Sequence, residues 1–171
     1  MKTMKLLFTV VSISLFLFGC GNDKKKEAPK EKLKLGTKKV ETKVDENVAS
    51  LVISASDAMK FDKNELKVKA GQKVKLTLRH TGKMDVNVMG HNVVILSKGV
   101  NLTAFGNKAA TAKDNAYIPE DAEGEVIAHT NLIGGGQTTT IEFEAPEAGT
   151  YDFLCSFPGH YALMKGKFIV E

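Results

Sequence analysis

Residues 73–80 read Lys-Val-Lys-Leu-Thr-Leu-Arg-His, and this alternating segment decides the fold class. In an extended chain, Val74, Leu76 and Leu78 project from one face. His80 is in phase with them, whereas Lys and Arg side chains dominate the other face. A period of two is typical of a strand in an antiparallel sheet that buries one face and exposes the other. Such a strand needs further strands to cover its apolar side.

Seven further short segments alternate or are rich in β-branched residues. They span residues 51–54, 64–68, 86–96, 125–130, 138–143, 150–155 and 166–170. Gly and Pro residues separate many of these segments, as expected of turns. Eight short strands joined by turns predict an all-β sandwich or barrel. The Ala-rich stretch at 99–119 does not alternate, and it predicts a short helical insert between strands.

The composition indicates one globular domain with appendages. The chain has 171 residues, two Cys and a formal net charge of +4, and two Cys are too few for a disulfide framework. Residues 1–19 hold two Lys and no acid, and residues 20–47 hold nine Lys and six acids. Residues 48–171 hold 13 Lys or Arg and 14 acids. The positive excess therefore precedes the predicted domain at 48–171, so no nucleic-acid partner is expected.

The first 19 residues have the pattern of an export signal. A basic start is followed by 13 uncharged residues, Leu6 to Phe18. This run matches the apolar part of a signal peptide and is shorter than the roughly 20 residues that span a bilayer. Leu17-Phe18-Gly19-Cys20 resembles the bacterial lipobox, which predicts cleavage before Cys20 and lipidation of that Cys, as with palmitate. The alternatives are an ordinary secretory signal with a chance Cys, and a transmembrane anchor.

The segment that follows Cys20 has the composition of a linker. Of residues 21–47, 15 of 27 are charged and none is aromatic. Such a stretch buries too little apolar surface to offset its ordering entropy, so we expect a disordered tether over 20–47. Its root-mean-square reach is roughly 25–35 Å. A basic patch on anionic lipid is the competing interpretation of Lys24, Lys25 and Lys26, and six interspersed acids weaken it.

Cys155 has no disulfide partner if Cys20 is lipidated, and its neighbours suggest a metal. Cys155, His160 and Met164 are spaced C-x4-H-x3-M between two predicted strands, and His91 offers a second imidazole. Two imidazoles, a thiolate and a weak thioether suit copper in an electron-transfer site. Structural zinc normally completes its tetrahedron with strong ligands, and Met is not one. An inert buried thiol beside an ordinary loop His is the alternative.

Three blocks of sequence add a family resemblance. Residues 88–92, 126–134 and 155–166 resemble the azurins, type 1 (blue) copper proteins of the cupredoxin family, from about residue 49 to the end. The resemblance implies an eight-stranded Greek-key sandwich with a helical insert. It implies one copper ion, with planar and axial ligands and supporting residues. The implied planar ligands are His91, Cys155 and His160, the axial ligands are Met164 and the Gly90 carbonyl, and the supporting residues are Asn92 and Phe157.

The sequence also departs from the azurins. Azurins usually carry a disulfide near the start of the domain, and this chain has no Cys there. Val93 stands where a Trp is common, and Tyr161 replaces a smaller residue beside a ligand. None of these positions is a ligand. His80 and His129 match azurin histidines that respond to pH without binding copper, so we exclude both from the site.

These observations predict a membrane-tethered blue copper protein that relays single electrons in the bacterial cell envelope. We expect a monomer, anchored by lipid, whose domain faces the periplasm or the exterior. The expected partners are a c-type cytochrome, a terminal oxidase, a nitrite reductase or a peroxidase. They would dock on apolar residues around His160, namely Met89, Pro158, Ala162 and Leu163.

Three other functions are weighed against this one. A copper carrier or sensor is the main alternative, but carriers favour open sites rich in exchangeable Met and His. A multicopper oxidase or copper nitrite reductase places a His beside the Cys, whereas Leu154 and Ser156 flank Cys155 here. No enzymatic activity is therefore expected. A metal-free lipoprotein with a binding or structural role is the third alternative.

Overall fold

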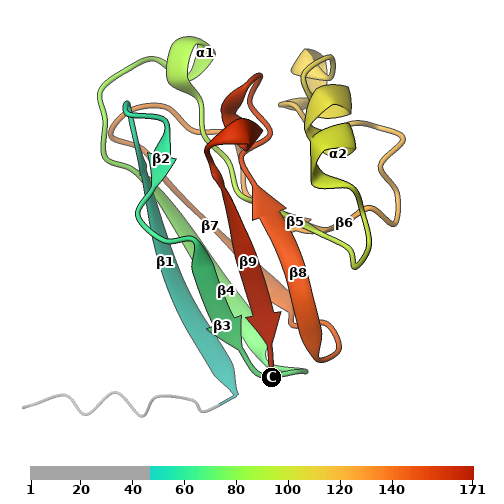
Figure 1. Cartoon of the computed structure of the whole chain (residues 1–171). Coiled ribbons are helices and arrows are strands. Elements are labelled where there is room, and N and C mark those ends of the chain that lie inside the picture. The colour runs from blue at the N-terminus through green and yellow to red at the C-terminus, as the bar shows by residue number, and fades with distance from the viewer. Residues whose placement is uncertain (1–46) are drawn as a thin grey trace, which may run out of the picture. The chain divides into compact units, whose positions relative to one another are not determined.

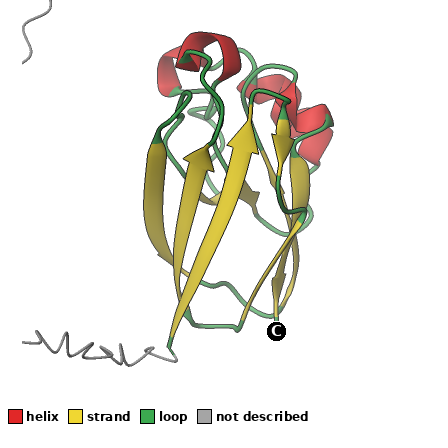
Figure 2. Cartoon of the chain, turned by 90° about the vertical axis from the view of Figure 1, so that its left-hand side faces the viewer, coloured by secondary structure: helices red, strands yellow, loops and turns green. Residues whose placement is uncertain are grey.

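The computed structural model describes residues 47–171 (Figure 1). The predicted signal peptide, Cys20 and all of the predicted linker except its last residue lie outside the described residues. The described part is a sandwich of two sheets with short helices at one end (Figure 2). No helix among residues 47–171 is long and apolar enough to cross a membrane.

The two sheets contain nine strands in residues 47–171. The first sheet has the order β2-β1-β4-β7, and its strands are β1 (Val48–Ser56), β2 (Lys60–Phe61), β4 (Lys73–His80) and β7 (Thr138–Glu144). The second has the order β3-β9-β8-β5-β6, and its strands are β3 (Glu65–Val68), β5 (Val94–Leu96), β6 (Val126–His129), β8 (Gly149–Leu154) and β9 (Lys165–Val170). The chain crosses repeatedly between the sheets, as in a Greek key, which confirms the predicted all-β sandwich.

The alternating segment lies at the centre of the first sheet. β4 pairs with β1 in parallel and with β7 in antiparallel orientation. Val74, Leu76 and Leu78 are fully buried between the sheets, as their alternation predicts. Burial of such a side chain contributes about 1.5–3 kcal/mol, so this face of β4 is a large part of what holds the sandwich together.

One predicted strand is wrong in its first half. Residues 86–96 were expected to be extended, but Val86–Met89 form the short helix α1, and only β5 follows in the sheet. The Asp85 side chain caps α1 by accepting the Asn87 backbone N–H at 2.8 Å. A run of Val and Met around a single Asn has no clear period over four residues, so the local cap decides the structure.

The predicted insert is confirmed and carries its own small core. It contains the helix α2 (Leu102–Ala109) and the 3-10 turn η1 (Lys113–Asn115). The Asn101 side chain caps α2 by accepting the Ala104 N–H at 2.9 Å. Phe105 and Ala109 of α2 pack with Val94, Leu96 and Leu154 of the second sheet, forming an apolar cluster separate from the main core.

Candidate metal centre

Three side chains from different parts of the chain converge at the helical end of the sandwich. His91 follows α1, Cys155 directly follows β8, and His160 begins the 3-10 turn η2 (His160–Ala162). Their potential ligand atoms all lie within 4.8 Å of one another. Cys155 Sγ is 3.8 Å from His91 Nδ1 and 3.6 Å from His160 Nδ1. The structure therefore brings together the three strong donors that the sequence singled out.

The ligand loop, residues 155–164, is closed by its own backbone. Gly159 has a φ of +79°, a left-handed conformation that favours glycine and reverses the chain before His160. The His160 N–H donates to the Phe157 carbonyl at 3.0 Å, and the Met164 N–H donates to the His160 carbonyl at 2.8 Å. The Cys155 N–H donates to the Met164 carbonyl at 2.9 Å. These bonds hold the Cys and His of the loop on one side of a tight turn.

The donor cluster is shielded from solvent. His91, Cys155 and Met164 are fully buried, and His160 is 2% exposed. Burial raises the pKa of the Cys155 thiol to about 12, although the backbone N–H groups of Asn92 and Phe157 favour the thiolate. Burial, together with the neighbouring His91 and His80, lowers the pKa of His160 to about 4. Without a metal, the site therefore holds a neutral thiol and neutral imidazoles at neutral pH.

Contacts on the side of the His91 ring that faces away from Cys155 fix its orientation. Its Nε2–H donates to the Ser56 carbonyl at 3.0 Å, which leaves the Nδ1 lone pair facing Cys155 Sγ. The His80 ring stacks on the His91 ring with centroids 4.5 Å apart. His80 Nε2 donates to the Met89 carbonyl at 2.8 Å, and its Nδ1 accepts the Gly82 N–H. Both His80 nitrogens are thus engaged, so this residue supports the site from outside the donor set.

A buried pair of polar side chains braces the two halves of the site. Asn92 Nδ2 donates to Ser156 Oγ at 2.8 Å, and the Ser156 N–H donates back to Asn92 Oδ1 at 2.9 Å. Both residues are fully buried, and they follow His91 and Cys155 directly in the chain. This double hydrogen bond fixes the separation of the segments that carry two donors. Phe157 packs on the His160 ring, with centroids 4.6 Å apart.

The spacing of the donors fits a single transition-metal ion. Metal–nitrogen and metal–sulfur bonds of about 2.1 and 2.3 Å, meeting at a trigonal angle, place the two donor atoms about 3.8 Å apart. The two sulfur–nitrogen distances of 3.8 and 3.6 Å agree with this value. The Gly90 carbonyl oxygen lies 3.9 Å from Cys155 Sγ, at the edge of the same cluster. Soft sulfur combined with two imidazoles is the donor set that copper prefers.

Comparison with known proteins agrees with this chemistry. The family of copper-binding proteins described as plastocyanin/azurin matches residues 47–171. Azurin-1 of Alcaligenes xylosoxydans xylosoxydans is 41% identical over 121 residues, which are 68% of this chain and 93% of that protein. The chain belongs to the plastocyanin/azurin family. Copper is therefore its cofactor, and the resemblance found in the sequence is confirmed.

Two further relatives of this cupredoxin extend the comparison. Outer membrane protein H.8 of Neisseria gonorrhoeae is 39% identical over 119 residues, which are 67% of this chain and 63% of that protein. The structure of auracyanin A, a "blue" copper protein from Chloroflexus aurantiacus, matches with a TM-score of 0.65 and 32% identity. That match covers 72% of this chain and 99% of auracyanin A. The broad class of the cupredoxin is thus a copper electron-transfer protein.

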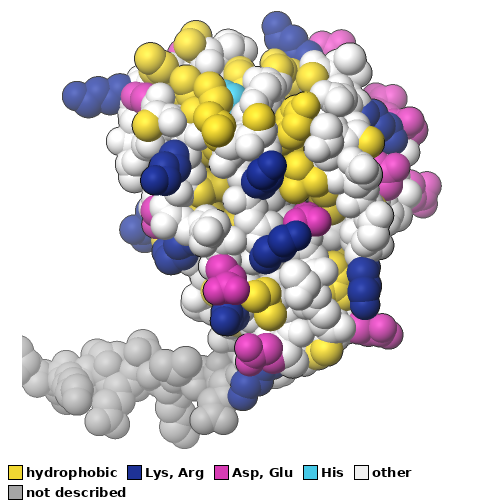
Figure 3. All heavy atoms as spheres, viewed as in Figure 1, with side chains coloured by type: hydrophobic (Ala, Val, Ile, Leu, Met, Phe, Trp, Pro, Cys, Tyr) yellow, Lys and Arg dark blue, Asp and Glu magenta, His cyan; other side chains and the backbone are white. Residues whose placement is uncertain are grey.

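An apolar surface surrounds the copper end of the cupredoxin. Hydrophobic side chains gather at the end that carries α1, and a histidine side chain is seen among them (Figure 3). Leu163 is 70% exposed, and Pro158 and Ala162 are also exposed, as expected for a docking patch, whereas Met89 is half-buried. Val88 is 62% exposed and was not predicted. The sequence pattern predicts a strand at this position, whereas Val88 lies in α1 and its side chain is turned outward.

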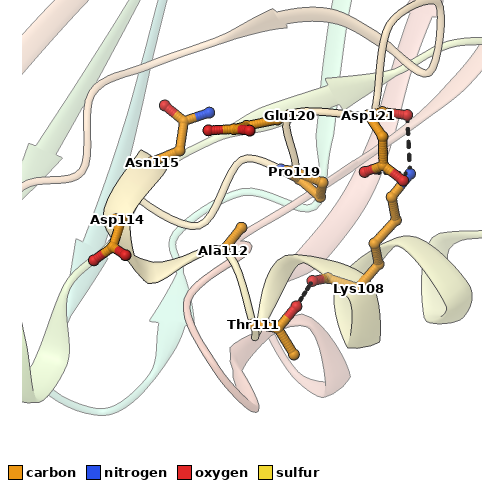
Figure 4. A pocket seen from close by; sticks show the side chains of 8 residues that line it. All are labelled: Lys108, Thr111, Ala112, Asp114, Asn115, Pro119, Glu120 and Asp121. Carbon is orange, nitrogen blue, oxygen red and sulfur yellow. Dashed lines mark hydrogen bonds and ion pairs between the residues drawn. The ribbon is translucent and has the colours of Figure 1, made fainter.

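The insert of the cupredoxin holds a separate surface pocket of about 300 Å³ (Figure 4). Lys108 spans its rim by pairing with Asp121 at 3.0 Å, and Thr111 Oγ1 donates to the Lys108 carbonyl at 2.9 Å. None of its lining residues is a His or Cys, and none belongs to the donor cluster. His129 is also outside the cluster, because it lies exposed at the end of β6. Neither feature contributes to the copper centre.

Proposed function

We propose that His91, Cys155 and His160 hold one copper ion in a plane, and that the protein relays single electrons through it. Met164 and the Gly90 carbonyl are proposed as weak axial ligands on opposite sides, with Asn92 and Phe157 as supporting residues. The observation that carries the proposal is the convergence of three buried donors at distances suited to one ion.

Bound copper supplies a one-electron couple between its Cu(II) and Cu(I) states. The protein contributes a donor set that it holds in place without the metal. Hydrogen bonds fix the His91 ring and close the ligand loop, so the ligands need little rearrangement between oxidation states. Because the ligands are also almost fully buried, the site favours retention of copper over its exchange. This closed arrangement supports an electron relay over a copper carrier.

His160 is the proposed point of electron entry and exit. Among the three donors of the cluster, His160 is the one that retains some solvent exposure. The residues on either side of its turn contribute to the apolar patch. The patch comprises Val88, Met89, Pro158, Ala162 and Leu163. An apolar surface around the ligand ring lets a partner approach closely without desolvating fixed charges. We propose a c-type cytochrome, a terminal oxidase, a nitrite reductase or a peroxidase as the partner.

We further propose that Cys20 is lipidated and anchors the domain to a membrane of the bacterial envelope. A relative named as an outer membrane protein supports this location. The position of β1 supports it as well. β1 ends at Ser56 beside His91, and its start at Val48 lies about 26 Å away by strand geometry. A tether joined at Val48 therefore enters the domain at the end opposite the copper site, which leaves that site accessible to partners held near the same membrane.

Repeated redox cycling separates the relay from a carrier. The copper-loaded protein is reduced with ascorbate and reoxidised with ferricyanide for many cycles in the presence of a Cu(I) chelator. An electron relay predicts that the visible thiolate-to-copper absorption band of the Cu(II) protein returns to its starting intensity after each cycle. Progressive transfer of copper to the chelator would contradict the relay and favour the carrier.

Lipid labelling tests the anchor. Cells that express the full chain are grown with radiolabelled palmitate, and the protein is followed by membrane fractionation. The wild-type chain is expected to carry label and to sediment with membranes. Cys20→Ala is expected to lose both properties. Label that persists in Cys20→Ala would overturn the proposed anchor and leave the copper site unaffected.

A further inference from the structure

Tyr161 joins the ligand loop to the helical insert. It follows His160 in η2, and its hydroxyl donates to Asn107 Oδ1 of α2 at 2.7 Å. Its ring packs against the insert cluster that contains Phe105 and Ala109. The contact thus links two elements that are more than 50 residues apart in the chain. One of these elements carries a copper ligand, and the other carries none.

The helix is shaped to receive this ring. A Cβ atom built on Gly106 would lie 2.5 Å from ring carbons of Tyr161, far inside van der Waals contact. Gly106 is buried in the interior of α2, where Gly costs roughly 0.5–1 kcal/mol relative to Ala. The bare backbone at this position lets the ring lie directly against the helix. The packing of the Tyr161 ring on Gly106 and the hydrogen bond of its hydroxyl to Asn107 therefore involve successive residues of α2.

Movement of Tyr161 is coupled to movement of His160. The His160 carbonyl accepts the N–H groups of Leu163 and Met164, and its own N–H is bound to the Phe157 carbonyl. These hydrogen bonds favour movement of the turn as a unit. A shift of this unit would carry the His160 ring away from the other donors, and the contact with α2 opposes that shift.

We propose that Tyr161 is a positioning residue that clamps the His160 turn onto α2 and slows the departure of His160 from the metal. The inference rests on the proposed ligand role of His160, and it is independent of electron transfer. It also explains why a large aromatic residue stands where the azurin pattern has a smaller one. The insert helix thereby becomes part of the support of the copper site.

Two variants delete the same hydrogen bond from opposite sides. Tyr161→Phe keeps the ring on Gly106, and Asn107→Ala removes the acceptor. Transfer of Cu(I) from each loaded protein to bicinchoninate is followed by absorbance. Each variant is expected to release copper about two- to tenfold faster, the factor that corresponds to one ordinary hydrogen bond. The double variant is expected to be no faster than either single variant, because both remove one interaction.

Hydrogen exchange of the metal-free chain gives a second readout. The Leu163 and Met164 amides, which bond to the His160 carbonyl, are expected to exchange faster in both variants by a similar factor. This measurement does not require copper binding. If the wild-type chain bound no copper, the proposed function would fail, and the clamp would still be tested by exchange.

Tyr151→Phe is the matched control. The Tyr151 hydroxyl donates to the Glu147 carbonyl, also at 2.7 Å, so this bond ties the first half of β8 to the residues before the strand and not to the ligand loop. This variant is expected to leave copper release and the two loop amides unchanged. Equal effects of Tyr151→Phe and Tyr161→Phe would show a general loss of stability and overturn the clamp. Unchanged release and exchange in Tyr161→Phe would overturn it as well.

Discussion

Cys155 and His160 illustrate how burial prepares a ligand at the scale of single residues. Both side chains are almost completely removed from water, which disfavours the thiolate and the imidazolium in the metal-free protein. The imidazole is thereby ready to bind at any pH above about 4, while the thiol has to lose a proton to the solvent. Copper binding and proton release are therefore linked at Cys155.

This linkage predicts one released proton per copper at pH 7. The Cys155 thiol, with a pKa of about 12, loses its proton when the metal binds. The pKa of His160 is about 4, and burial lowers the pKa of His91 below its ordinary value, so both rings are already neutral at pH 7. Calorimetric titration of Cu(II) in buffers of different ionisation enthalpy measures the number. Two or more protons would contradict the depressed histidine pKa values.

Asn92 is predicted to be the most sensitive supporting residue. Asn92→Ala removes two buried hydrogen bonds and leaves the Ser156 N–H without its partner. The free energy of unfolding is expected to fall by about 2–4 kcal/mol, which urea denaturation of the metal-free protein measures. Asn87→Ala, at an exposed residue of α1, is the control and should cost under about 1 kcal/mol. Equal effects would refute the bracing role of Asn92.

At the scale of elements, close backbone contact holds the segment before α1 in place. A Cβ atom at Gly134 would lie 2.7 Å from the Val86 nitrogen, and one at Gly135 would lie 2.4 Å from the Lys83 backbone. The Gly135 N–H also donates to the Met84 carbonyl at 2.8 Å. The glycines therefore allow the 132–137 loop to lie directly on the segment that leads through α1 to His91.

Gly135→Ala is accordingly predicted to destabilise the protein by about 2–4 kcal/mol, because backbone atoms rather than a flexible side chain have to move. Thermal unfolding of the metal-free protein measures the loss. Gly149→Ala is the matched control, since its added Cβ meets nothing closer than 3.6 Å, and it should change stability by under about 1 kcal/mol. Tolerance of both substitutions would show that the contact at Gly135 is unimportant.

The elements also show where sequence reasoning works and where it stops. The alternation of β4 predicts its buried face correctly because the same period of two residues continues over all eight residues of the strand. α1 could not be predicted in the same way, since four residues carry too little periodicity and the Asp85 cap decides them. Tyr161 stands out in the sequence only as a departure from the azurin pattern. Its contact with Gly106 and Asn107 depends on how the insert folds back on the sheet.

At the scale of the whole molecule, the candidate copper site was more predictable than the details of the sandwich. Cys155, His160 and Met164 lie within one ten-residue loop, and their residue types alone indicate metal-binding chemistry. The exposure of Val88 and the supporting stack of His80 on His91 depend on long-range packing. The pairing of β1 with β4 in parallel also follows from packing, because alternation does not specify strand direction.

The buried histidines also make the stability of the whole metal-free domain depend on pH. The unfolded chain binds protons at His91 and His160 as the pH falls through about 6.5, whereas burial lowers the pKa of both rings in the folded chain, that of His160 to about 4. The free energy of unfolding is therefore expected to fall between pH 6.5 and 4, by about 3 kcal/mol for His160. Urea denaturation at a series of pH values measures this slope.

His129→Gln serves as the control for this slope. His129 is exposed and lies outside the donor cluster, so the variant should keep the wild-type profile.

Copper loading should raise the free energy of unfolding, because the ion binds the folded state alone. A constant free energy of unfolding from pH 7 to 5 would contradict the account of the buried imidazoles.

Titration of the metal-free protein with Cu(II), followed by visible absorption, tests the central claim most directly. The proposed site predicts an intense thiolate-to-copper band that saturates at one equivalent of Cu(II). Cys155→Ser should abolish the band, while His129→Gln should leave it unchanged. A colourless wild-type protein, or a band that survives Cys155→Ser, would contradict the proposed copper centre.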